Sequence, residues 1–130
     1  MRIKVKKIGS FFNSFKFAFE GLQYLVRTQK NARFHLIATI FVVALGIWLK
    51  ISFSNWIFIS IAISLVWITE LFNTSLENLF DLFHPGIDEH VKSGKDTSAA
   101  AVLITAILSV VIGLLTLGPA LVQRIKQIIP

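Results

Sequence analysis

Cysteine is absent from this sequence, so neither a disulfide framework nor a thiolate metal site can form. The three histidines, His35, His84 and His90, lack the spacing of a zinc site. There is no G-x-x-x-x-G-K-[ST] motif, so a nucleotide must be held in a way unlike that of a P-loop enzyme. No internal repeat or low-complexity segment is present. Charged residues are also few, at 15% of the chain.

Apolar residues, by contrast, make up 55% of the chain, and the mean hydropathy is +0.72. Soluble domains average about 45–50%. The excess is concentrated in three blocks, at residues 34–49, 56–69 and 99–117, which charged residues avoid almost completely. With its flanks, each block approaches the roughly 17–25 residues that span a bilayer. We predict an all-α membrane protein, a single domain over residues 1–130 with three transmembrane helices.

The basic start of the chain is followed by an apolar stretch that Asn13, Lys16 and Glu20 interrupt, and no small-residue cleavage site follows. We therefore expect no cleaved signal peptide. Residues 10–30 place apolar and charged side chains on separate helical stripes, which predicts an amphipathic helix lying in the membrane interface. The apolar stripe consists of Phe11, Phe15, Phe19, Leu22 and Val26.

Eight of the thirteen cations lie before the first apolar block, between Arg2 and Arg33. The positive-inside rule explains them without a nucleic-acid partner and predicts a cytoplasmic N-terminus. The turn at residues 50–55 is then outside, the loop at 83–96 inside, and the C-terminus outside. Arg124 and Lys126 oppose this orientation.

The helical spacing of the second block continues to Phe83, where Pro85 and Gly86 interrupt it. We therefore predict membrane helices at residues 33–50, 56–83 and 97–118. The third is expected to begin with Asp96 or Thr97 as its N-cap and to end near residues 118–119.

The most informative residues lie on the second predicted span. At about 100° per residue, Glu70, Asn73, Glu77 and Asp81 share one helical face. Glu70 lies roughly 21 Å from Trp56, still within a hydrocarbon layer of about 30 Å, and Glu77 reaches headgroup depth. This arrangement suits a reaction between a lipid hydroxyl and a water-soluble donor, with Glu70 as general base.

Two other interpretations of this acidic column are open. The acids can pair with cations of neighbouring helices or bind an ion that holds an oligomer together, or the column can serve a proton or cation transporter. Lys95, which precedes the third block, suits a polyphosphate ligand but also suits a simple positive-inside flank.

Over residues 14–117 the chain resembles the small prokaryotic diacylglycerol and undecaprenol kinases. One family motif, E-x-x-N-[ST]-x-x-E-x-x-x-D, is matched from Glu70 to Asp81, and a second, K-D-x-x-[AS]-[AG]-A-V, from Lys95 to Val102. The resemblance implies a homotrimer in the bacterial inner membrane whose active sites form between subunits. It implies ATP as phosphate donor, Mg2+, and a lipid alcohol as acceptor.

The resemblance also implies roles for individual residues. Glu70 is the base, Asn73 lies close to the transferred phosphoryl group, and Glu77 holds the divalent ion. The implied nucleotide contacts are Asn73, Glu77, Asp81, Asp88, Lys95 and Asp96, and the implied lipid contacts are Glu70, Asn31, Arg33, His35 and Ser98.

Two positions depart from the family pattern. Gln29 stands where a second metal-binding glutamate is usual, which predicts a weaker Mg2+ site. Asp88 stands where the family usually has a histidine, which weakens the expectation for that nucleotide contact. The segment Asn31-x-Arg33-x-His35 is similar to the undecaprenol kinase branch and favours undecaprenol as substrate. Diacylglycerol is the alternative, and an inactive assembly partner is a further one.

Overall fold

The chain folds entirely into helices over the residues that the structure, a computed structural model, describes: 11–83 and 88–128. Four helices follow one another: α1 (Phe11–Thr28), α2 (Lys30–Leu49), α3 (Phe53–Phe83) and α4 (Glu89–Ile128). The last three are long and apolar enough to cross a membrane, and a third or less of their most apolar windows is buried. The predicted all-α membrane class is confirmed.

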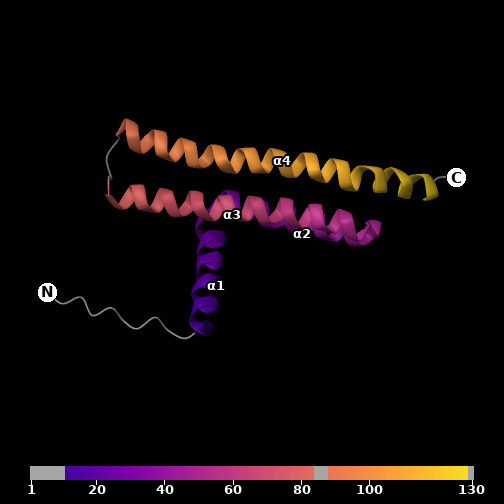
Figure 1. The fold of residues 1–130 in the computed structure, drawn as a ribbon, viewed down its shortest axis with the longest axis horizontal. Helices are drawn as coiled ribbons and strands as arrows, with labels where there is room; N and C mark the ends of the chain where they lie inside the picture. The colour runs from indigo at the N-terminus through magenta and orange to yellow at the C-terminus, as the bar shows by residue number, and fades with distance from the viewer. Residues whose placement is uncertain (1–10, 84–87, 129–130) are drawn as a thin grey trace.

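The bundle is built on the long pairing of α3 with α4, which run side by side with α2 against them (Figure 1). Hydroxyl groups join α3 to α4 within the apolar region. Ser109 Oγ donates a hydrogen bond of 3.0 Å to the Ala62 carbonyl, and the hydroxyls of Thr69 and Thr105 lie 2.9 Å apart. Such bonds stabilise helix pairs inside a membrane, where apolar side chains gain little by leaving lipid.

At the other end of the bundle, α2 closes at Lys50, whose φ of 52° places it in the left-handed region. The Lys50 amide bonds the Ile47 carbonyl and the Ile51 amide bonds the Gly46 carbonyl, which forms a Schellman motif. Gly46 allows the close approach of Trp56, since a Cβ there would lie 2.9 Å from the indole ring. The chain therefore turns directly into α3.

α1 stands at a steep angle to the bundle (Figure 1). It ends at Thr28, and Arg33 of α2 holds this end: its Nε and Nη2 donate bonds of 3.1 Å to the carbonyls of Val26 and Arg27. The guanidinium thus satisfies carbonyls that have no partner within α1 and complements the helix dipole. The prediction of a helix in this segment is confirmed for residues 11–28.

The prediction for the start of the third membrane helix is wrong. Neither Asp96 nor Thr97 is an N-cap, because α4 already begins at Glu89. Instead, Asp88 Oδ1 accepts the amides of His90 at 2.7 Å and Val91 at 3.3 Å, the pattern of an N-cap. Residues 89–96 of the predicted loop are therefore helical.

The predicted end of that helix is wrong as well, because α4 continues through Pro119 to Ile128. A proline inside a helix lacks an amide donor and its ring crowds the carbonyl four residues earlier, which destabilises the helix but can kink it without ending it. Several sequence predictions fall outside the described residues. They concern the helix break at Pro85 and Gly86, His84, the basic residues 2–7, and residue 10 of the predicted surface helix. The side chain of Phe11 is not described either.

Candidate active site

The polar residues of the second half of α3 pass from the interior of the bundle to its surface. Glu70 is 2% exposed and Asn73 and Thr74 are also buried, whereas Glu77 is partly buried and Asp81 is exposed. A charged residue so well buried is costly unless something compensates for it.

A cavity of about 280 Å³ lies beside these residues, between α2, α3 and α4. Its polar lining consists of Asn31, His35, Glu70, Asn73 and Glu77. Its α4 wall includes the small side chains of Ala99 and Ala106, which leave room between the helices. Three of the four residues predicted to share a face of α3 thus border a single cavity.

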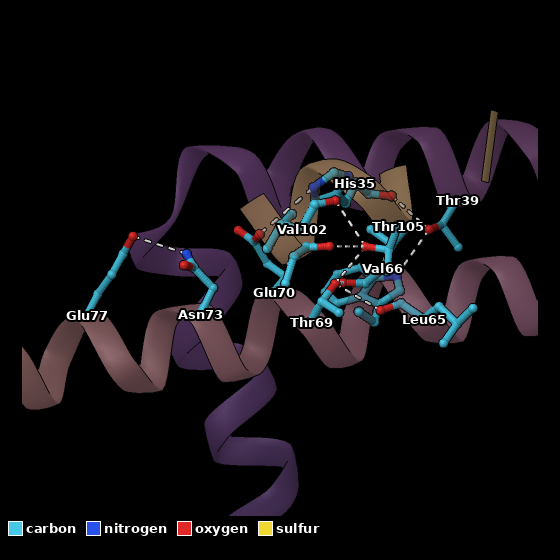
Figure 2. A network of polar contacts seen from close by, with 12 residues as sticks. His35, Thr39, Leu65, Val66, Thr69, Glu70, Asn73, Glu77, Val102 and Thr105 are labelled. Atoms are coloured by element: carbon cyan, nitrogen blue, oxygen red, sulfur yellow. Dashed lines mark hydrogen bonds and ion pairs between the residues drawn. The ribbon is translucent and has the colours of Figure 1, made fainter. Parts of the chain in front are cut away.

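Glu70 is held near His35 but is not fully hydrogen-bonded. Glu70 Oε2 lies 4.0 Å from His35 Nε2, which is beyond a hydrogen bond (Figure 2). This oxygen is buried and accepts no hydrogen bond from any described residue. A buried acceptor without a partner costs about 1–3 kcal/mol. A hydroxyl entering the cavity would supply the missing donor.

Asn73 connects the cavity to α4. Its Nδ2 donates a bond of 3.1 Å to Glu77 Oε1, drawn in Figure 2, and its Oδ1 accepts one of 2.7 Å from Ser98 Oγ. Ser98 is itself buried at 9% exposure and does not line the cavity. The serine therefore fixes the amide orientation, and the amide in turn fixes the Glu77 carboxylate.

A second group of hydrogen bonds braces the helices deeper in the bundle. Trp67 Nε1 donates to Thr39 Oγ1 at 3.1 Å, and that hydroxyl donates to the His35 carbonyl at 2.7 Å. Thr69, which directly precedes Glu70 in the chain, joins α3 to Thr105 of α4 (Figure 2). These contacts fix both walls of the cavity beside His35 and Glu70.

Comparison with known sequences shows which protein family has this arrangement of residues. The sequence profile of the family described as prokaryotic diacylglycerol kinase matches residues 16–117, most of the chain. The chain belongs to this family. It is therefore a lipid kinase of the membrane, and the predicted resemblance is confirmed.

Two relatives of this lipid kinase are each 34% identical to it. One, named undecaprenol kinase, comes from Bacillus subtilis (strain 168), and the match covers 88% of this chain and 94% of that protein. The other, named diacylglycerol kinase, comes from Synechocystis sp. (strain ATCC 27184 / PCC 6803 / Kazusa), and the match covers 85% of this chain but only 63% of that protein.

Among the described residues, the potential metal ligands of the lipid kinase are too few for a closed protein cage. No cluster of three or more metal-ligating side chains occurs in the described part of the chain. Mg2+ commonly takes one or two carboxylates and completes its shell with water and phosphate oxygens. Glu77 supplies one carboxylate beside the cavity. The side chain of Gln29, at the N-cap of α2, makes no capping bond and does not line the cavity.

The two residues of the Lys95-Asp96 motif point to different places in the kinase. Lys95 forms an ion pair with Asp81 across the α3–α4 interface, where both predicted nucleotide contacts meet. Asp96 instead borders an open hollow of about 530 Å³ on α4, together with Glu89 and Lys92. Neither residue lines the cavity beside Glu70.

The predicted lipid contacts are also divided. Asn31 and His35 face the cavity, but Arg33 is engaged at the end of α1. Sequence analysis assigned neither this capping role, nor the Asp88 N-cap, nor the Ser98–Asn73 bond. An aspartate just before residue 89 was the one available signal, because it is a preferred N-cap residue.

Proposed function

We propose that this lipid kinase transfers the terminal phosphoryl group of ATP to the hydroxyl of undecaprenol. The observation that carries the proposal is the buried Oε2 of Glu70, which accepts no hydrogen bond from the described part of the chain, on a residue that lines a cavity between three membrane helices. A lipid alcohol that enters this cavity from the bilayer brings its hydroxyl close to the Glu70 carboxylate, which can accept the hydroxyl proton.

In the proposed step, Glu70 takes the proton of the lipid hydroxyl as that oxygen attacks the terminal phosphorus of ATP. The new oxygen–phosphorus bond forms, the bond to the ADP oxygen breaks, and the proton stays on Glu70 until it is released to solvent. Asn73 lies one helical turn away, and its fixed amide suits a position near the phosphoryl oxygens.

Nucleotide and metal are assigned to the more exposed side of the cavity. In this proposal Glu77 would hold Mg2+, and the ion would neutralise charge on the phosphoryl group. The family resemblance adds Gln29 as a second, uncharged contact, although its side chain does not line the cavity of the single chain. Asp81, Asp88, Lys95 and Asp96 are the proposed nucleotide contacts. Nucleotide binding at Lys95 must share or open the ion pair with Asp81.

Undecaprenol is favoured over diacylglycerol by the residues at the lipid side. Asn31 and His35 line the cavity, and Arg33 fixes the end of α1 beside them. The relative named undecaprenol kinase matches over 94% of its length, whereas the one named diacylglycerol kinase matches over 63%. Ser98 acts on the lipid only through Asn73 in this scheme.

The proposed setting is a homotrimer in the bacterial inner membrane with its N-terminus in the cytoplasm. α1 then lies as an amphipathic helix in the cytoplasmic interface. Both stripes of this helix are exposed in the single chain: the apolar one with Phe19 and Leu22, and the charged one with the Lys16–Glu20 pair. This setting places Glu77 and Lys95 on the side from which ATP arrives.

The test is ATP-dependent labelling of lipid in detergent micelles by the purified protein. Undecaprenol and diacylglycerol are supplied at equal mole fraction with radiolabelled ATP and Mg2+, and the products are separated by thin-layer chromatography. We expect faster labelling of undecaprenol. A preference for diacylglycerol refutes the choice of lipid and leaves the kinase intact, whereas labelling of neither favours a transporter or an inactive assembly partner.

A further inference from the structure

A second polar hollow lies at the opposite end of the bundle, where α2 turns into α3 and the end of α4 passes by (Figure 1). Its volume is about 470 Å³. At a rise of about 1.5 Å per residue, Asn55 on its edge is roughly 33 Å along α3 from Glu77, close to the thickness of a bilayer's hydrocarbon layer. The hollow beside Asn55 and the polar region around Glu77 therefore lie at opposite membrane surfaces.

Among the residues that the structure describes, the charged side chains that line this hollow are both cationic. Lys50 and Arg124 line it, and no acidic residue does. All seven acids of the chain lie at other positions: Glu20, Glu70, Glu77, Asp81, Asp88, Glu89 and Asp96. Neither cation has an ion pair or a side-chain hydrogen bond with any described residue. Two unpaired cations beside one hollow create a local field that favours an anion.

Each cation has a structural feature that an ordinary surface cation lacks: an unusual backbone conformation at Lys50, and a contact with an aromatic ring at Arg124. Lys50 occupies the left-handed position of the Schellman motif, where glycine fits best and a Cβ costs about 1–2 kcal/mol. Arg124 lies over the Trp48 ring with its Cζ 6.0 Å from the centroid. The buried Nε of this guanidinium finds no acceptor within residues 11–83 and 88–128.

Neutral hydrogen-bonding groups complete the lining. Ser52, Gln123 and Gln127 border the hollow beside the two cations. Phosphate oxygens accept bonds from hydroxyl, amide and guanidinium donors alike. Trp48, at the same end of the bundle, is typical of the headgroup level of a membrane.

We propose that this hollow binds a phosphate group at the membrane surface opposite the kinase site, with Lys50 and Arg124 as its charged contacts. The ligand class is a phosphate-bearing anion, supplied either by the headgroup of an anionic phospholipid or by free phosphate. The site stands apart from the proposed reaction and requires neither ATP nor the lipid alcohol.

The experiment uses the intact protein in mixed micelles and follows tryptophan fluorescence. Phosphatidylglycerol and phosphatidylcholine with brominated acyl chains are compared as quenchers, because Trp48 and Trp56 lie at this end. We expect stronger association of the anionic lipid. A hydrogen bond from a charged group to a phosphate oxygen is stronger than the general attraction of a surface cation, so Lys50→Asn and Arg124→Gln should each lower the preference about tenfold, and together abolish it.

Lys126→Gln is the matched control, because it removes an exposed cation of the same helix end that does not line the hollow. Asparagine was chosen for position 50 because it tolerates the left-handed backbone. Arg124→Lys keeps the charge and so separates loss of charge from loss of packing on Trp48. The control and Arg124→Lys should keep the preference. An equal loss in Lys126→Gln, or no preference in the unaltered protein, overturns the proposal.

Added inorganic phosphate identifies the source of the phosphate group. If phosphate displaces the brominated lipid and sodium chloride of equal ionic strength does not, the site takes free phosphate. If neither displaces it and the lipid preference persists, the site takes the headgroup.

Discussion

Replacing Glu70 by glutamine tests the proposed chemistry most directly. The substitution keeps the shape of the side chain but removes its capacity to take a proton. Folding should change little, because Glu70 Oε2 accepts no hydrogen bond from the described residues and the nearest partner, His35, lies 4.0 Å away. The new amide therefore breaks no protein hydrogen bond.

The effect on rate should be far larger than the effect on folding. General-base catalysis contributes about 10² to 10⁴ in rate, equivalent to about 2.7 to 5.4 kcal/mol of activation free energy at about 1.36 kcal/mol per tenfold. We expect kcat of Glu70→Gln to fall by that factor while ATP binding is kept. Thr69→Val, which removes the neighbouring bond to Thr105, is the matched control and should keep kcat within severalfold.

The assay measures turnover and ATP binding across a Mg2+ titration, after size-exclusion chromatography shows that each variant assembles like the unaltered protein. Glu77→Gln should be partly rescued by raised Mg2+, because its loss is one of metal affinity, whereas Glu70→Gln should not. Near-normal turnover of Glu70→Gln refutes the general-base role. Failure of this variant to assemble would show that the carboxylate serves the fold.

Three further variants test single contacts. Gln29→Glu should lower the Mg2+ concentration needed for half-maximal turnover, because it adds a charge to the proposed site; an unchanged titration shows that position 29 does not touch the metal. Ser98→Ala should lower kcat about fivefold, since it removes a bond worth about 1 kcal/mol to Asn73; a normal rate shows that Asn73 needs no support. Asp88→Ala should destabilise the protein by about 1 kcal/mol in thermal unfolding and Asp88→Ser should restore it, because Asp88 caps α4; equal stability of both variants with the unaltered protein contradicts that role.

The membrane class and the acidic column were predictable because both depend on patterns along one helix. Apolar blocks of spanning length identify membrane helices, and a spacing of about 100° per residue places Glu70, Asn73 and Glu77 together. The structure brings these three to one cavity. Local periodicity sufficed because a regular helix determines the relative directions of its own side chains.

Contacts between helices were not predictable in the same way. The bond from Ser98 to Asn73 joins residues 25 positions apart, and the Lys95–Asp81 pair joins residues 14 apart. The local sequence pattern does not show whether Arg33 contacts a lipid or, as the structure has it, caps the end of α1. Likewise, the start of α4 was misplaced because Asp88, Asp96 and Thr97 are all acceptable N-caps by residue type.

The small volume of the cavity beside Glu70 limits what the enzyme can recognise. About 280 Å³ is just below the roughly 300–1,000 Å³ of typical small-molecule sites, so in the proposed reaction the cavity admits the alcohol end of a lipid and little of its tail. The tail must continue past Phe34 and Leu103, which line the cavity and are 69% and 61% exposed. Beyond that rim the substrate is surrounded by bilayer. Discrimination then rests on the few atoms next to the hydroxyl, and polyprenols of different lengths should serve this kinase equally well.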